Sequence, residues 1–230
     1  HSMGNAIGNL IDYWEAIEST NFFMGGAIWD WVDQAIYNYD PATGERYWGY
    51  GGDFGQNNKP NDGMFCMNGV MRPDLSPKAQ YYEVKKVYQN IGVKAVDMTQ
   101  GRIEIFNKNY FAPLTDYQIV WSLWKDGVCV EKDKPLQGAR NIVGPRQKQQ
   151  YTLPYDYASL DPESEYFVKV QFLLGENMPW AEKGYVQMEE QLRVRGEEKA
   201  APAIIQVAAS DKKINAEEKN GRITLTGDGF

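Results

Sequence analysis

The sequence has 230 residues, of which 43% are hydrophobic and 24% are charged, a composition that is typical of globular domains and excludes a disordered or collagen-like chain. It carries 24 Lys and Arg against 31 Asp and Glu, a net charge of −7, and an acidic chain without a basic cluster is a poor match to nucleic-acid backbones or anionic membranes. No apolar run approaches the roughly 20 residues that a membrane-spanning helix needs. We therefore expect neither nucleic acid nor membrane as a partner.

Residue types that build metal clusters and catalytic triads are scarce. Two cysteines, Cys66 and Cys129, cannot form a disulfide framework, which leaves two free thiols or a single bridge. The one histidine, His1, excludes a multi-histidine metal site and an internal Ser-His-Asp triad. Aromatic residues, by contrast, make up 13% of the chain; most such side chains belong to protein cores, but their faces also stack on the C–H faces of sugar rings.

The chain starts with His1-Ser2-Met3 and shows no basic or apolar region of a secretory signal. This start is either the scar of a cleaved tag or native sequence cut from something longer. A low cysteine content is compatible with the cytoplasm and with the periplasm, so the compartment stays open.

The first part of the chain predicts helix, then strand. Apolar residues at spacings of three and four predict a helix over residues 5–19, with Asn5 as its N-cap. The short apolar run 25–31 (GGAIWDW) predicts a buried strand of a parallel sheet. One such unit cannot cover both faces of a parallel sheet, so we expect it to be the end of a larger α/β domain.

A long loop and a second helix follow. Residues 38–75 are rich in glycine, proline and aromatic residues, and a loop of this length inside a compact domain is usually functional. Residues 76–89 predict a helix in which Ser76 is the N-cap and Pro77 occupies the first helical position, where its missing N–H costs nothing.

From about residue 90 the apolar residues alternate with period two. Lys125-Asp126-Gly127 predicts a hairpin turn within this region. About seven short strands with regularly spaced turns indicate an immunoglobulin-like β-sandwich. The predicted strands are 93–99, 102–107, 117–124, 127–131, 147–153, 165–173 and 184–194.

The end of the chain predicts a further β unit. The charged segment 195–199 reads as a linker, and strands are predicted over 203–209 and 222–226. This last unit is too short to have a core of its own. We therefore expect both ends of the chain to be cuts through larger domains.

Three segments carry a resemblance to a known family. They are residues 1–5 (HSMGN), 25–34 (GGAIWDWVDQ) and 50–69, which contains YGGDFG, PND and FCMNG. In this order and spacing they resemble the large β-galactosidases of glycoside hydrolase family two, over the whole chain and most strongly in residues 1–90.

The resemblance implies an α/β plus all-β chain with three parts. Residues 1–90 would be the C-terminal part of a (β/α)8 barrel that carries the active site. Residues 91–200 would be an immunoglobulin-like β-sandwich, and residues 201–230 the beginning of a C-terminal β-sandwich domain. In this scheme 25–31 is the eighth barrel strand, between the seventh and eighth barrel helices.

The same resemblance implies a galactose-binding and sodium-binding role for four residues. His1 would hydrogen-bond galactose hydroxyls, and Trp29 would pack its indole on the apolar face of galactose. The Phe65 carbonyl oxygen and the Asn68 side chain would bind a sodium ion that contacts the galactose 6-hydroxyl. Oxygen ligands suit a hard cation of this kind.

The position of these residues agrees with barrel geometry, but other readings stay open. Barrel sites lie at the C-terminal ends of the strands and in the loops that follow, which here means the end of strand 25–31 and loop 38–75. In a regular strand Trp29 and Trp31 share one face, and one of them packs into the core if the strand is irregular. Asn68 is otherwise an ordinary turn residue.

The loop offers further aromatic and acidic residues. Tyr47, Trp48 and Tyr50 either line a sugar subsite or merely close the loop. Asp53 and Asp62 are expected to be structural, because aspartate commonly caps turns.

The catalytic carboxylates are expected outside this sequence. Retaining glycosidases use a nucleophile and an acid/base about 5–5.5 Å apart, and the resemblance places both glutamates, and the magnesium ligands, before His1. Glu15 lies in the predicted helix, while Asp30 and Asp33 lie near the end of one strand, whereas an opposed pair needs separate strands. We therefore predict no catalytic residue here and no activity of this chain alone.

Three functions are compared. The first is hydrolysis of terminal non-reducing β-D-galactose residues by the parent protein, acting on galactosides, with sodium and magnesium as cofactors and a homo-oligomeric assembly. The alternative is a non-catalytic carbohydrate-binding or interaction module. The third is a sister activity such as β-glucuronidase or β-mannosidase, which the segments quoted above match less well.

Overall fold

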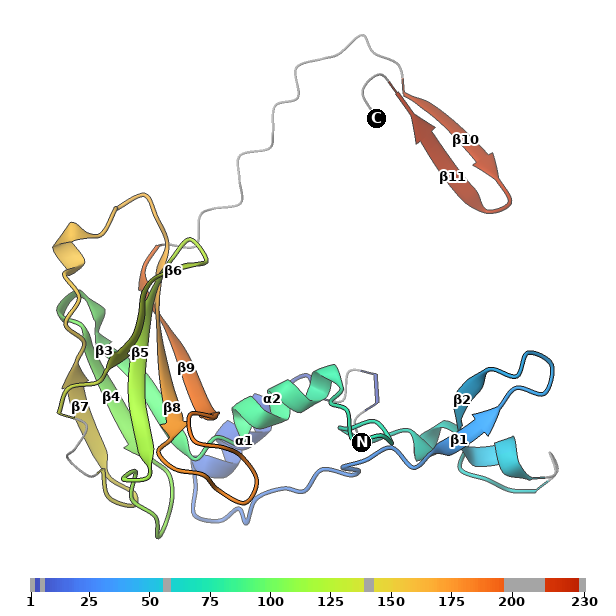
Figure 1. The fold of residues 1–230 in the computed structure, drawn as a ribbon, viewed down its shortest axis with the longest axis horizontal. Helices are drawn as coiled ribbons and strands as arrows, with labels where there is room; N and C mark the ends of the chain where they lie inside the picture. The colour runs from blue at the N-terminus through green and yellow to red at the C-terminus, as the bar shows by residue number, and fades with distance from the viewer. Residues whose placement is uncertain (1–2, 5–6, 56–58, 139–142, 197–213, 228–230) are drawn as a thin grey trace.

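The computed structural model describes residues 3–4, 7–55, 59–138, 143–196 and 214–227. Figure 1 shows a β-sandwich, two helices beside it, and two separate two-stranded hairpins. Neither helix of the described residues is long and apolar enough to cross a membrane.

The sandwich consists of seven strands in two antiparallel sheets. The three-stranded sheet has the order β3-β4-β7 and the four-stranded sheet the order β6-β5-β8-β9. All seven strands predicted from the alternation are confirmed, with their ends moved by a few residues. Their bounds are β3 Ile91–Asp97, β4 Arg102–Asn107, β5 Tyr117–Lys125, β6 Val128–Pro135, β7 Lys148–Thr152, β8 Tyr166–Leu174 and β9 Val186–Arg195.

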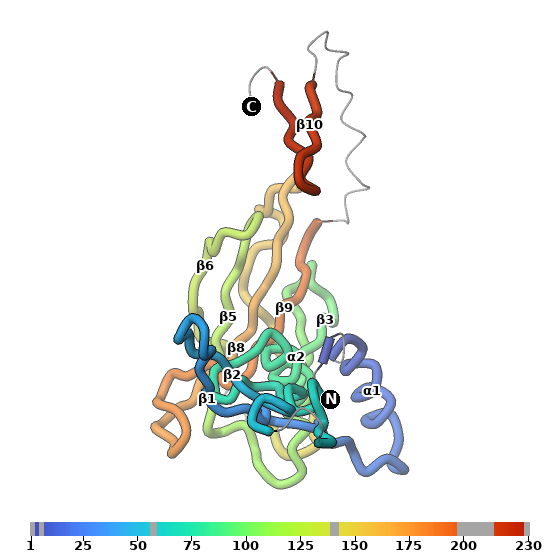
Figure 2. Tube along the Cα trace, turned by 90° about the vertical axis from the view of Figure 1, so that its right-hand side faces the viewer, coloured from blue at the N-terminus to red at the C-terminus, as the bar shows by residue number. Residues whose placement is uncertain are grey.

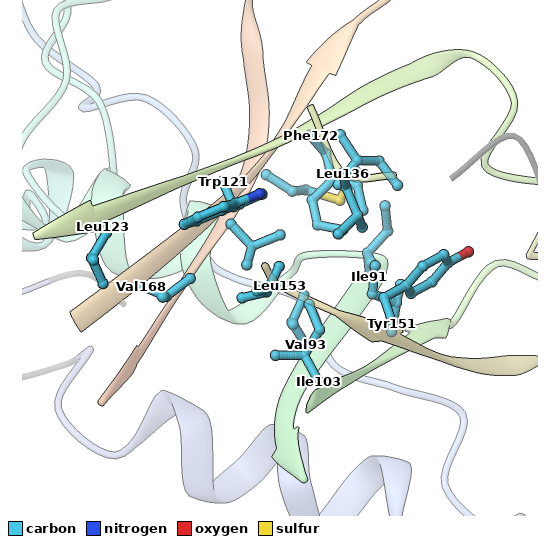
Figure 3. Close-up of a cluster of buried hydrophobic side chains, with 14 of the residues drawn as sticks. Ile91, Val93, Ile103, Trp121, Leu123, Leu136, Tyr151, Leu153, Val168 and Phe172 are labelled. Atoms are coloured by element: carbon cyan, nitrogen blue, oxygen red, sulfur yellow. The ribbon is translucent and has the colours of Figure 1, made fainter. Parts of the chain in front are cut away.

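The hydrophobic core lies between the two sheets, where side chains of both inner faces meet (Figure 3). Strand β8 alternates strictly between buried and half-buried residues, so that Val168, Val170 and Phe172 all point inward. Trp121 of β5 lies beside them, and Ile103 of β4 faces them from the other sheet. Each fully buried aliphatic or aromatic side chain contributes roughly 1.5–3 kcal/mol of transfer free energy, and this core stabilises the sandwich.

The hairpin predicted at Lys125-Asp126-Gly127 joins β5 to β6 and is confirmed. Asp126 has φ 46° and Gly127 has φ 80°. Two positive φ angles in succession are the signature of a type I′ turn, whose twist matches that of the flanking strands.

The Asp161 carboxylate gives the sandwich an acid-sensitive contact. It accepts hydrogen bonds from the Glu163 N–H, the Lys125 ammonium and the Ser164 hydroxyl. These contacts, the Glu163 N–H above all, lower the pKa of Asp161 from 3.8 to about 2. Because the folded-state pKa lies below the unfolded one, the stabilisation is complete above about pH 4 to 5 and is lost as the pH falls toward the folded-state value.

We therefore expect Asp161→Asn to be less stable than the unaltered protein near neutral pH, and the difference to close as the pH falls through this window. Urea unfolding followed by tryptophan fluorescence at a series of acidic pH values measures the gap. A gap that stays constant with pH would show that Asp161 stabilises the fold without its charge.

The two predicted helices are confirmed and are shorter than predicted: α1 is Leu10–Glu18 and α2 is Ala79–Val87. They lie side by side next to the sandwich (Figure 2). The ring centroids of Trp14 in α1 and Tyr88 at the end of α2 are 4.3 Å apart. Lys108 joins α1 to the sandwich through an ion pair with Glu18 at 2.9 Å.

Of the two predicted N-caps, Asn5 is not described by the structure and Ser76 is wrong. Asn5 lies outside the described residues, and α1 begins later because Asn9 adopts a left-handed conformation with φ 70°. Ser76 does not cap α2; its hydroxyl accepts a hydrogen bond from Arg72 and its N–H donates to Asp74. The hydrogen bonds of Ser76 therefore stabilise the turn around residues 72–77, and α2 starts only after Lys78.

The predicted strand over 25–31 is wrong for the part of the chain that the structure describes. No strand is assigned there, and in this segment both Trp29 and Trp31 are exposed. Strands require hydrogen-bonded neighbours, and only Val32 forms a parallel bridge, to Met71. An apolar run therefore gave the wrong local structure.

The predicted loop 38–75 is partly ordered as secondary structure. An antiparallel hairpin of β1 (Ile36–Tyr39), which starts two residues before the predicted loop, and β2 (Arg46–Gly49) is followed by the 3₁₀ turns η1 (Gly51–Phe54) and η2 (Gly63–Cys66). The hairpin turns at Gly44, with φ 73°.

The last described residues form the hairpin of β10 (Asn215–Lys219) and β11 (Arg222–Thr226). The strand predicted over 222–226 is confirmed with the same bounds. β10 was missed because its sequence, NAEEK, carries no apolar alternation. The predicted strand 203–209 and the linker beyond Gly196 lie outside the described residues.

Candidate functional site

Residues 30–34 and 66–71 form one hydrogen-bonded unit. The end of the long loop returns to the segment that follows Trp29 and binds it along the backbone. The bonds join Asp30 N to Asn68 O (3.2 Å), Val70 N to Asp30 O (3.1 Å), Met71 N to Trp31 O (2.8 Å), Asp33 N to Met71 O (3.0 Å) and Gln34 N to Cys66 O (2.7 Å). These bonds bring together the two segments that carry Trp29, Phe65 and Asn68.

Gly69 allows the two segments to approach this closely. A Cβ atom at this position would lie 2.2 Å from the Asp33 nitrogen and 2.4 Å from the Val32 carbonyl carbon. Both atoms belong to the backbone and cannot move aside as a side chain would. The crossing of the two segments therefore requires a glycine at position 69.

A buried ion pair lies at the same crossing. The Lys78 ammonium is 2.6 Å from Asp33 Oδ1, and the two side chains are 18% and 0% exposed. The same Asp33 oxygen accepts the Gly69 N–H at 2.8 Å, while Lys78 also donates to the Gly69 carbonyl at 2.9 Å. Both peptide groups of Gly69 are thus bound by the pair.

Asn68 is almost completely buried, at 1% exposure. Its side-chain oxygen Oδ1 has no hydrogen-bond partner among the described residues. Buried polar atoms are nearly always satisfied, and a hard cation binds such oxygens. This oxygen therefore fits the sodium ligand that the family resemblance implies, and the fit rests on its burial and its missing partner.

Trp29 and Trp31 both reach the surface of the described chain, with 64% and 49% exposure. Trp31 makes an edge contact with Tyr81 at 6.3 Å between ring centroids. Between Trp29 and Asp30 the peptide bond is cis. The Asp30 carboxylate is engaged locally, by the Trp31 N–H and the Gln34 amide, each at 2.7 Å.

Phe65 lies in η2, where its N–H donates to the Asp62 carbonyl at 3.1 Å, and its side chain is 58% exposed. It precedes Asn68 by one turn of the same loop. The structure therefore brings Trp29, Phe65 and Asn68 into one region. His1 lies outside the described residues.

Two of the three loop aromatics close the β1–β2 hairpin. The Tyr47 hydroxyl accepts a hydrogen bond from the Asn38 amide at 2.9 Å. The Trp48 ring stacks on Tyr37 at 3.8 Å between centroids. Cross-strand aromatic pairs of this kind stabilise hairpins, so these contacts support the loop-closing alternative for both residues.

The two loop aspartates differ. Asp53 Oδ2 accepts the Tyr50 N–H at 2.8 Å at the start of η1, which confirms its structural role. The Asp62 side chain makes no cap hydrogen bond to η2. That role falls to Asn61, whose Oδ1 accepts the Gly63 N–H at 3.0 Å; an asparagine side chain reaches the backbone two residues on as readily as aspartate does.

Sequence reasoning missed Lys78 and considered Asp33 only as a substitute catalyst. Lys78 contacts a residue 45 positions away, and no local pattern signals such a contact. In the structure Asp33 is buried, and one of its oxygens is bound to an ammonium and a backbone N–H.

Two family models match the chain. Residues 1–93 match the TIM barrel domain of glycosyl hydrolases family 2. Residues 103–195 match domain 4 of beta-galactosidase.

Curated proteins similar to the chain carry the name beta-galactosidase. One from Priestia megaterium is 36% identical over the whole chain and one from Psychromonas ingrahamii is 33% identical over the whole chain; the chain covers 21% of each. One from Vibrio cholerae is 38% identical over 83% of the chain, which corresponds to 17% of that protein. The chain thus spans about a fifth of the length of these relatives. It belongs to the β-galactosidases of glycoside hydrolase family 2, with sequence from their TIM-barrel domain and from their domain 4.

Proposed function

We propose that the protein that contains this segment hydrolyses terminal non-reducing β-D-galactose residues with retention, and that this segment forms one wall of the galactose pocket. The name shared by the relatives supports the reaction. The pocket is inferred mainly from Asn68 Oδ1, which is buried and has no hydrogen-bond partner among the described residues. The Asn68 backbone carbonyl accepts a hydrogen bond from Asp30, the residue after the exposed Trp29. An oxygen ligand for a hard cation and an exposed aromatic face on neighbouring segments suit the binding of a sugar with a 6-hydroxyl.

Each residue of the pocket has a distinct part in binding. The Trp29 indole offers an apolar face to the C–H face of galactose. Asn68 Oδ1 and the Phe65 carbonyl would hold sodium, which when bound supplies a positive charge for a sugar hydroxyl. His1 donates to or accepts from galactose hydroxyls. Held in one place, these groups orient the sugar for the reacting carboxylates, which converts binding energy into rate.

We propose that the two reacting carboxylates and the magnesium ligands are residues of the complete protein that lie outside these 230 residues. Retention needs a nucleophile and an acid/base about 5–5.5 Å apart. Asp30 and Asp33 are both bound within the chain, Asp30 by an amide and a backbone N–H and Asp33 by Lys78 and Gly69. Asp33 Oδ2 is buried without a partner among the described residues, and the proposal gives neither carboxylate a catalytic part.

The proposal also includes the arrangement of the parts. Residues 1–90 would complete a (β/α)8 barrel, residues 91–200 would be an immunoglobulin-like domain, and residues 201–230 would open a further β-domain. The seven strands in two antiparallel sheets support the second part. A homo-oligomeric assembly completes the proposal.

The test compares two proteins, one expressed from the complete coding frame and the 230-residue chain alone. We expect the first to hydrolyse an aryl β-D-galactoside and to release galactose with retained configuration, visible by NMR of the first product. The chain alone should give no turnover, because its described acidic residues near the site are engaged structurally.

Two controls separate the alternatives. Aryl β-glucuronide and aryl β-mannoside should be poor substrates, and a preference for either would replace the galactosidase proposal with a sister activity. If the complete protein lacks turnover but tryptophan fluorescence saturates with galactose, the non-catalytic binding module is the correct function.

A further inference from the structure

Gly69 is held from both sides of its backbone by one ion pair. Asp33 Oδ1 accepts the Gly69 N–H at 2.8 Å, and the Lys78 ammonium donates to the Gly69 carbonyl at 2.9 Å. Asp33 and Lys78 are themselves 2.6 Å apart. The position and tilt of this backbone segment are therefore set by two charged side chains that come from different parts of the chain.

The burial of this pair is informative. The Asp33 side chain is 0% exposed and that of Lys78 is 18% exposed. Removing two charges from water costs about as much as their attraction returns, so a buried pair is a poor stabilising device compared with apolar packing. What the pair provides is a fixed geometry, because each charge is directed by its hydrogen bonds to one peptide group.

The residue next to this fixed peptide is Asn68. Its Oδ1 is buried and has no hydrogen-bond partner among the described residues, so no described group orients the amide through this oxygen. Its orientation is set from the backbone, where the Asn68 carbonyl accepts the Asp30 N–H at 3.2 Å and the following N–H is bound by Asp33.

We propose that Asp33 and Lys78 are positioning residues that set the cation affinity of Asn68. This inference rests on the proposed function and deepens it, since it names what fixes the ligand geometry of the same site. Groups that orient metal ligands without touching the metal typically change affinity by about 10- to 100-fold when they are removed. The proposal gives Asp33 and Lys78 their effect through the backbone of Gly69 and hence through Asn68, although Asp33 Oδ2 is also buried without a partner among the described residues.

The test uses the protein expressed from its complete coding frame, with Lys78→Met and Asp33→Asn. Sodium binding is followed by ²³Na NMR line broadening, and KM and kcat for an aryl β-galactoside are measured while NaCl replaces choline chloride at constant ionic strength. Lys78→Met should raise the half-saturating sodium concentration about tenfold or more. KM at low sodium should rise with it, while kcat at saturating sodium stays within about twofold.

Lys108→Met is the matched control. Lys108 also forms an ion pair at 2.9 Å, with Glu18, and its side chain is 23% exposed, close to that of Lys78. The chemical change is the same and the two lysines are similarly exposed, whereas Glu18 is 42% exposed and Asp33 is buried. The Lys108–Glu18 pair joins α1 to the sandwich and lies away from the crossing of residues 30–34 and 66–71. Its sodium midpoint should match that of the unaltered protein.

Asp33→Asn keeps the shape of the side chain and an acceptor for the Gly69 N–H but removes the charge, so it is the variant to use if Lys78→Met does not fold. We expect it to raise the half-saturating sodium concentration about three- to tenfold, which is less than the effect of removing an orienting group completely. A variant with reduced melting temperature and an unchanged sodium midpoint would overturn the inference and leave the proposed function standing. If the unaltered protein itself shows no sodium broadening, the sodium site of the proposed function is wrong, and the positioning role falls with it.

Discussion

Trp29→Ala is expected to lower kcat/KM for an aryl β-galactoside by about a hundredfold, a loss of roughly 2.7 kcal/mol in transition-state binding. The indole is 64% exposed, so among the described residues it contributes little packing, and the proposed function assigns its face to the sugar. Loss of an aromatic contact area of this size is worth a few kcal/mol once the sugar covers it. Steady-state kinetics and a melting curve on the protein from the complete coding frame measure both effects.

Trp180→Ala is the control for this substitution. Trp180 is 65% exposed, almost the same as Trp29, and lies between β8 and β9, on the sandwich. Its removal should leave kcat/KM unchanged. If Trp29→Ala keeps full activity, the stacking role is wrong; if it instead loses several degrees of melting temperature, Trp29 packs in the complete protein as the alternative interpretation holds.

Gly69→Ala should destroy sodium binding and activity together and should destabilise the barrel segment by about 3 kcal/mol or more. The new methyl group would lie 2.2 Å from the Asp33 nitrogen and 2.4 Å from the Val32 carbonyl carbon, so one backbone segment has to move. Overpacking that can be relieved by side chains costs typically 1–3 kcal/mol, and backbone against backbone offers no such relief. Thermal unfolding and ²³Na NMR measure the two losses.

Gly55→Ala tests whether this effect belongs to position 69. Gly55 lies in the same loop, and none of the described residues lies within 4 Å of a new Cβ there. Its φ of −132° is a conformation open to any residue. It should behave like the unaltered protein. Activity retained in Gly69→Ala would show that the crossing of residues 30–34 and 66–71 is not needed for the site.

The sandwich was predictable because its information is local. Alternation along β8 and the Lys125-Asp126-Gly127 turn specify strands and a hairpin without reference to distant residues. An inner face buried against a second sheet enforces this pattern, which explains why the predicted strand ends differ by only a few residues from those observed.

For the candidate site, the sequence suggested residues but not the contacts between them. Family resemblance named Trp29, Phe65 and Asn68, but no pattern could show that Lys78 reaches Asp33, 45 positions away. The segment 25–31 failed for the same reason: an apolar run becomes a strand only through its neighbours. The interpretation of Ser76 failed because a serine near a helix start can equally bond within the preceding turn.

Helix α2 links the crossing of residues 30–34 and 66–71 to the sandwich. It is nine residues long, about 13.5 Å at 1.5 Å per residue. Just before its first turn, Lys78 donates a hydrogen bond to the Gly69 carbonyl. Near its last turn, Lys85 and Lys86 donate hydrogen bonds to two backbone carbonyls of β9, those of Val186 and Glu189. A chimaera that exchanges domain 4 between relatives must therefore preserve these acceptors on β9. Otherwise the C-terminal end of α2 loses its attachment to the sandwich, and the crossing that contains Asn68, which the other end of α2 holds, is expected to shift.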